Sequence, residues 1–235
     1  MQVSVKQAFT ALFRQPGWVK TLAFGSLLMF IPIVGQLVAQ GYGARIMKAV
    51  AFEDGDRLPP LEGIRTYLKE GMLPFMAALL WSVPITLVYY GVAILALLVG
   101  VGGMFLGVAL EMPRWAAILL GTAPATLLFV VGLIVTVLMA RRWHAADTLV
   151  EVTGKLEYAW KLKEIHRFLK VLGMEGRLAY LRCILGNLVA VLAGTCLFGM
   201  GVIFAPFLMM VASAHLQGQL YRRYLDLGGE PYPRG

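Results

Sequence analysis

Two histidines, His144 and His215, are the residues whose chemistry would be most versatile, and each lies near the end of a long apolar run. Paired imidazoles of this kind can hold haem or a metal ion. Asp147 follows His144 by three residues, which places both side chains on one helical face. Histidines at helix ends also interact with the helix dipole without any ligand. No second spaced ligand motif accompanies them, so we expect neither a metal nor a cofactor.

Nucleophilic catalysis has little support in this chain. Cys183 and Cys196 lie thirteen residues apart in the last apolar run and form no CxxC pair, so they are expected to act as small apolar side chains. No serine lies in a nucleophile elbow. We therefore expect no catalytic residue and a protein that is not an enzyme.

A proline break beside two glutamines is the most distinctive polar pattern. Pro32 interrupts an apolar run, and Gln36 and Gln40 follow it one helical turn apart. A broken helix frees backbone carbonyls, so this cluster could line a polar cavity. The glutamines could equally bond to neighbouring helices. If the two halves of the chain pair, three further residues would join the cavity: Asn187, Pro206 and Gln217.

Composition determines the elements that must position these residues. The 235 residues are 59% hydrophobic and 14% charged, and residues 71–110 and 115–140 contain no Lys, Arg, Asp or Glu. Apolar stretches of this length are typical of transmembrane helices. The composition excludes a soluble enzyme, a disordered chain and a disulfide-rich secreted module.

The predicted fold is an all-α, polytopic integral membrane helical bundle, formed by residues 1–235 as one domain. About six membrane segments, some broken or re-entrant, are expected in four apolar runs: 21–44, 71–110, 115–140 and 183–216. Pro32 is expected to divide the first run, and Gly199–Gly201 and Pro206 the last. The second run contains either two helices or one long helix. Amphipathic patterns predict interfacial helices near 3–15, 60–70 and 155–172.

Charged side chains are absent from the middle of every predicted span. Glu70 and Glu111 lie at boundaries, where water or lipid head groups can solvate them. This pattern disfavours proton relays and carboxylate-bound ions, and we expect no buried charge.

The net charge of +8 is concentrated in four basic blocks beside the apolar runs: Lys6 to Lys20, Arg45 to Lys69, Arg141 to Arg182, and Arg222 to Arg234. Cations at such positions contact anionic lipids and orient the chain. We therefore expect a multi-pass protein of the cell (inner) membrane with both termini in the cytoplasm. Membrane lipids are the expected partners, and nucleic acid is not.

Two stripes of small residues would allow helices to approach closely. One contains Gly103 and Gly107, and the other Gly186, Ala190 and Gly194. Such stripes pack either within the chain or against a partner membrane protein or second copy.

Several short motifs resemble domain-of-unknown-function family 4013. They are Phe13 to Lys20, Ile31 to Gly35, Gly41 to Arg45, Leu58 to Pro60 before Gly71, and His215 to Tyr221. The resemblance covers nearly the whole chain except residues 100–140. It implies a polytopic prokaryotic membrane protein and supplies no catalytic residues.

The leading functional hypothesis is a non-enzymatic scaffold or accessory subunit of a membrane complex. Amphipathic helices and small-residue stripes without buried charges favour it. The alternative is a small transporter or lipid-handling protein with its path at the breaks around Pro32 and Pro206.

Overall fold

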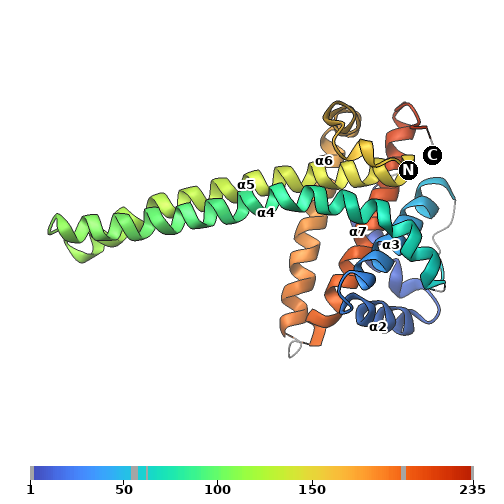
Figure 1. Cartoon of the computed structure of the whole chain (residues 1–235), viewed down its shortest axis with the longest axis horizontal. Helices are drawn as coiled ribbons and strands as arrows, with labels where there is room; N and C mark the ends of the chain where they lie inside the picture. Colours follow the sequence, from blue (N-terminus) through green and yellow to red (C-terminus); the bar gives the residue numbers. More distant parts are fainter. Residues whose placement is uncertain (1–2, 54–57, 62, 197–199, 234–235) are drawn as a thin grey trace. The chain divides into compact units, whose positions relative to one another are not determined.

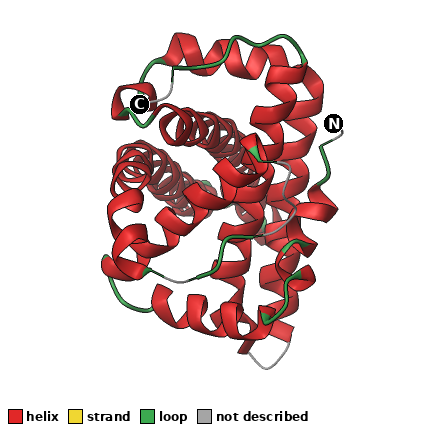
Figure 2. Ribbon diagram, turned by 90° about the vertical axis from the view of Figure 1, so that its right-hand side faces the viewer, coloured by secondary structure: helices red, strands yellow, loops and turns green. Residues whose placement is uncertain are grey.

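The computed structural model describes residues 3–53, 58–61, 63–196 and 200–233, and within these residues it is all-α with no strand (Figure 2). The helices are α1 (Val5–Thr10), α2 (Trp18–Met29), α3 (Val34–Phe52), α4 (Ile64–Ala109), α5 (Arg114–Thr153), α6 (Leu162–Cys196) and α7 (Met200–Asp226), with short 3₁₀ turns η1 (Leu12–Arg14) and η2 (Leu156–Ala159). They form two compact units, one of residues 1–78 with 144–235 and one of residues 79–143. α4 and α5 each run from one unit into the other.

The first unit is built around α7, which packs against α1, α2, α3 and α6 (Figure 1). Its core joins apolar and aromatic side chains of α3, the first turn of α4, and α7: Val38, Tyr42, Ile46, Val50, Tyr67, Phe207 and Val211. The Tyr42 and Phe207 rings stack with their centroids 5.9 Å apart. Burial of this face supplies most of the stability that such helices lack alone.

A tight turn at Pro32 separates α2 from α3. Ile33 has φ of 63° and ψ of −61°, and the Val34 N–H donates to the Pro32 carbonyl across 2.6 Å. This geometry is a γ-turn, which is strained for a β-branched residue. The run 21–44 therefore contains two packed helices. α2, with 12 residues, is about 18 Å long and shorter than the ~30 Å hydrocarbon layer.

The expected break at Pro206 is wrong, because α7 continues through it from Met200 to Asp226. A proline in the second turn of a helix removes only one hydrogen bond. The neighbouring Ala205 and Phe207 are buried and hold the helix in place. The other break expected in this run, at 199–201, includes Gly199, which lies outside the described residues.

The second unit is an antiparallel hairpin of α4 and α5. Glu111, with φ of 54°, ends α4 as the left-handed residue of a Schellman motif: its N–H donates to Val108 and that of Met112 to Gly107. α4 is thus one continuous helix through Pro84, rather than two. Large apolar side chains of both helices face outward along most of the hairpin.

Three helices are long and apolar enough to cross a membrane: α4, α5 and residues Ile203–Asp226 of α7. Trp18–Met29 is a shorter apolar helix. The most apolar stretches of α4 and α5 are each only 11% buried, whereas that of α7 is 61% buried. The structure is therefore consistent with a membrane protein, and the number of about six membrane segments stays a prediction.

The C-terminal tail folds back over an aromatic cluster. The Tyr232 ring stacks on that of Tyr224, with the centroids 5.9 Å apart, and meets that of Tyr158 edge to face, with the centroids 5.7 Å apart. Its hydroxyl donates to a carboxylate oxygen of Glu164 across 3.2 Å. Burial is the main cause that raises the pKa of the Tyr232 hydroxyl above its ordinary value. The tail thus ties α7 to the segment before α6 and to its first turn.

Candidate functional site

A polar stripe runs along the last turns of α5, where His144, Asp147 and Glu151 follow one another at steps of three and four. The Gln217 side-chain amide on α7 faces this stripe, with Nε2 at 3.3 Å from Asp147 Oδ2 and 3.4 Å from His144 Nδ1. Because an amide nitrogen only donates, both partners act as acceptors. Gln217 therefore bridges an imidazole and a carboxylate.

Both carboxylates of the stripe are buried, with Asp147 8% and Glu151 4% exposed. Asp147 Oδ1 and Glu151 Oε2 have no hydrogen-bond partner among the described residues. Lys48 on α3 lies close enough to attract the Glu151 charge. Both carboxyl groups lie beyond the run 115–140, so they do not contradict the expectation that the spans themselves hold no buried charge. Burying such groups without hydrogen-bond partners is destabilising and is uncommon in protein cores.

A small cavity adjoins His144 between α5, α6 and α7. The Tyr180 ring stacks on the His144 ring with their centroids 5.9 Å apart. The free volume of the cavity is about 10 Å³. Ile184 and Leu216 form the apolar part of the wall. Its polar part is formed by Cys183, Asn187, Ser213 and Gln217. Asn187 Oδ1 is buried and has no partner in the described part of the chain. The cavity therefore suits about one water-sized polar molecule.

The six residues expected to share a polar cavity divide into two groups. Asn187 and Gln217 line the His144 cavity together. Gln36 and Gln40 are half-buried on α3, while Pro32 and Pro206 are exposed, and none of these four belongs to that wall.

His215 is held in a different network from His144. It is 2% exposed, and its Nδ1 accepts from Gln219 Nε2 at 2.9 Å. Gln219 also binds the backbone of Ser4 through its side-chain oxygen at 2.7 Å and its nitrogen at 3.3 Å. This chain of contacts fastens the N-terminus to α7. Among the described residues, no group of three His, Cys, Asp or Glu side chains could hold a metal ion.

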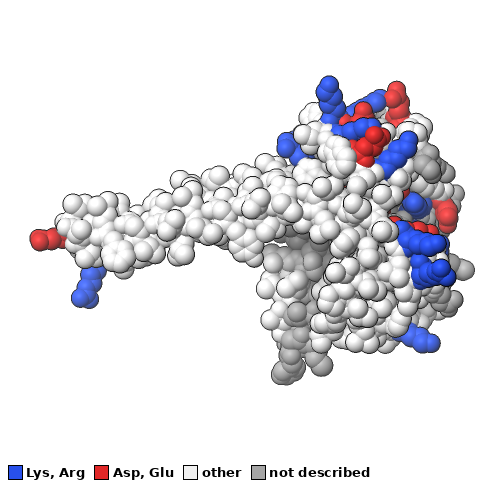
Figure 3. Space-filling view, in the orientation of Figure 1, with Lys and Arg blue, Asp and Glu red and all other residues white. Residues whose placement is uncertain are grey.

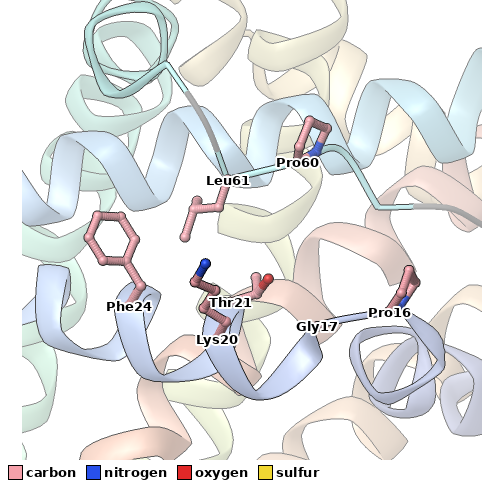
Figure 4. A pocket seen from close by; sticks show the side chains of 7 residues that line it. All are labelled: Pro16, Gly17, Lys20, Thr21, Phe24, Pro60 and Leu61. Carbon is pink, nitrogen blue, oxygen red and sulfur yellow. The ribbon is translucent and has the colours of Figure 1, made fainter.

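A larger hollow, called here the α2 crevice, lies between the start of α2 and the loop 58–61. Its main part, about 400 Å³, is lined by Pro16, Gly17, Lys20, Thr21, Phe24, Pro60 and Leu61 (Figure 4). An adjoining hollow of about 200 Å³ shares Pro16, Thr21 and Pro60 with it. Sequence reasoning missed this site, because its walls come from segments forty residues apart.

The loop wall of the crevice is fixed by two buried tyrosines. The Tyr67 hydroxyl donates to the Pro60 carbonyl across 2.6 Å, and the Tyr42 hydroxyl to that of Pro59 across 3.0 Å. Arg45 lies over the Tyr67 ring and pairs with Glu70 at 2.8 Å. The crevice is therefore bounded by anchored backbone.

The small-residue stripes take part in packing within the chain. A Cβ on Gly103 would lie 2.7 Å from the Leu120 carbonyl oxygen, and one on Gly107 would lie 2.6 Å from Ala117. α4 and α5 therefore approach backbone to backbone along the hairpin.

In the second stripe, Gly186 receives the Phe9 ring, 2.6 Å from where a Cβ would be, and Ala190 is half-buried. The surroundings of Gly194 lie outside what the structure describes.

Comparison with known proteins gives one match. The family model described as "Protein of unknown function (DUF4013)" matches residues 24–205. Searches of curated proteins and of solved structures find no match. Since the matched segment covers well over half of the chain, the protein belongs to the DUF4013 family.

Proposed function

We propose that this protein is a non-enzymatic integral membrane scaffold or accessory subunit of a membrane complex. The observation that carries the proposal is the surface of the α4–α5 hairpin. Between its charged tip, Glu111 and Arg114, and its basic end at Arg141 and Arg142, the hairpin contains no Lys, Arg, His, Asp or Glu. On the face seen in Figure 3 it is correspondingly free of charge along its length.

An apolar surface of this extent needs lipid or another apolar protein surface around it. Residues 79–109 form about 46 Å of helix, which is long enough to cross a hydrocarbon layer of about 30 Å and to extend beyond it. In the proposed arrangement α2, α3, α6 and α7 supply the other membrane segments, to a total of six. Both termini and the basic blocks face the cytoplasm of a prokaryotic cell.

The exposed cations of α6 are the proposed docking face for a cytoplasmic partner. Lys163 and Lys170 are both exposed on the turns before the break at Gly173, where φ is 55° and ψ is −134°. Such a face suits an acidic partner surface. The alternative of a transport path receives less support, since neither Pro32 nor Pro206 lines the cavity or the crevice described above.

The test is capture of the full chain from native membranes in mild detergent after brief cross-linking. We expect a stoichiometric partner that is reduced several-fold by Lys163→Glu with Lys170→Glu. The matched control, Arg114→Glu at the opposite end of the hairpin, should leave capture unchanged. A strictly monomeric species, or capture equally sensitive to both variants, would contradict the proposal.

A further inference from the structure

The α2 crevice combines an apolar wall with a single described cation. Phe24, Leu61 and Pro60 form apolar sides, and Lys20 and Thr21 add one ammonium and one hydroxyl (Figure 4). A volume of about 400 Å³ lies within the range of small-molecule sites, which are mostly apolar with a few polar groups that orient the ligand. The site therefore suits an amphiphile with one anionic end.

At the start of α2 the Trp18 N–H donates to the Gln15 carbonyl and the Thr21 N–H to the Gly17 carbonyl. The N–H groups of Val19 and Lys20 have no backbone acceptor among the described residues. Gly17, with φ of 74°, precedes the helix and offers no side chain to cap it. The first N–H groups of a helix need acceptors and favour negative charge. The crevice wall formed by Gly17, Lys20 and Thr21 is therefore complementary to a phosphate.

The surface beside the crevice is itself apolar. On α2 and the turn after it, Val19, Leu27 and Phe30 are each more than half exposed. Trp18 packs edge to face on Phe13 at 5.1 Å, just before the crevice. Aromatic side chains next to a lysine are typical of the membrane interface, where lipid phosphates lie. This surface would bring an acyl chain to the crevice from the side.

We propose that the α2 crevice binds one anionic phospholipid, with its phosphate at Lys20 and Thr21 and an acyl chain against Phe24 and Leu61. The site rests on the membrane location proposed above. It adds a specific lipid contact that neither a scaffold role nor an apolar surface requires. The tyrosine-anchored loop keeps the crevice open, so little reorganisation accompanies binding.

The test uses the full chain, purified in detergent and incubated with a defined mixture of lipids. Native mass spectrometry then measures which lipid stays bound. We expect phosphatidylglycerol to be retained over phosphatidylcholine and over a free fatty acid. Lys20→Gln should weaken phosphatidylglycerol retention about tenfold, because a charge-assisted contact is lost. Arg114→Gln, which removes one exposed cation outside the four basic blocks, should have no effect.

A second pair of variants tests the acyl chain. Phe24→Ser should reduce retention several-fold, while Leu227→Ser, at an exposed apolar position beyond the end of α7 that lies outside the crevice and the α2 surface, should not. Both native residues are exposed, so neither change should unfold the protein. Equal retention of the two phospholipids, preference for the fatty acid, or indifference to Lys20→Gln would overturn the proposal.

Failure here is distinguishable from failure of the scaffold role. Partner capture depends on Lys163 and Lys170 and is measured without added lipid. Wild-type protein that captures a partner yet retains no phosphatidylglycerol overturns only the lipid site.

Discussion

Gln217 is the residue on which the polar contacts between α5 and α7 depend. Its amide satisfies both His144 Nδ1 and Asp147 Oδ2, and it is only 4% exposed. Replacement by leucine keeps the volume but leaves a buried carboxylate without its donor. We expect Gln217→Leu to lower the free energy of unfolding by about 1–3 kcal/mol.

Thermal unfolding in detergent measures this effect. Gln36→Leu, at a half-buried position on α3, serves as the control and should change stability by less than about 0.5 kcal/mol. Equal melting temperatures for the two variants would show that the Gln217 bridge contributes nothing.

Tyr232 is expected to make the free energy of unfolding fall as the pH rises into the alkaline range. Burial raises the pKa of its hydroxyl, so the folded state keeps a proton that the unfolded chain loses above about pH 10. Stability is therefore full below pH 10 and falls above it, by at most ~1.4 kcal/mol per pH unit for this group. Tyr232→Phe should flatten the fall measured by thermal unfolding between pH 9 and 11. Tyr90→Phe, at an exposed position of α4, should leave it as steep as in the wild type.

Individual residues of the His144 site were only partly predictable. His144 and Asp147 are visible from the sequence as two residues on one face, and Glu151 continues that face at a step of four. The missed signal is this polar stripe beyond Arg142, where the apolar run has ended but the helix has not. The partners on α6 and α7 are non-local, so spacing alone could not supply them.

At the scale of elements, the hairpin depends on glycine where the two backbones meet. A Cβ on Gly103 would lie 2.8 Å from the Gly121 Cα, whereas one on Gly102 would meet nothing within 4 Å. Gly103→Ala should therefore destabilise the hairpin by about 1–3 kcal/mol through overpacking.

The neighbouring Gly102→Ala provides the matched control. It adds the same methyl group to the same helix in open space and should be neutral or slightly stabilising. Thermal unfolding of both variants in detergent decides the matter. If Gly102→Ala is the more damaging change, the packing of α4 on α5 is not as described.

A proline in the sequence predicted a helix break correctly only where the tertiary packing also required a turn. Pro32 lies in the turn between α2 and α3. Gly35 permits this turn, because a Cβ at its position would collide with the Leu28 carbonyl oxygen of α2. Pro84 and Pro206 lie inside continuous helices instead. A proline removes one hydrogen bond, and tertiary packing decides whether the helix survives that loss.

At the scale of the whole molecule, the all-α class follows from long charge-free runs, which leave few other ways to satisfy the backbone in an apolar medium. The count of segments does not follow as directly. α2 is apolar but short, and α3 is largely buried within the first unit. Composition reports the polarity of a segment, whereas its depth and neighbours depend on contacts with distant parts of the chain.

The central claim is that the α4–α5 hairpin lies in lipid, and cysteine accessibility in sealed vesicles tests it most directly. Single cysteines would replace Leu97, Leu127 and Met112 in a chain with Cys183 and Cys196 changed to serine. Leu97 and Leu127 are 65% and 67% exposed, and Met112 lies in the loop at the tip. We predict that a water-soluble maleimide added on the side of the tip labels position 112 and leaves 97 and 127 unlabelled until sodium dodecyl sulfate dissolves the vesicles and unfolds the protein. Labelling of positions 97 and 127 in the folded protein as fast as that of position 112 would contradict the account.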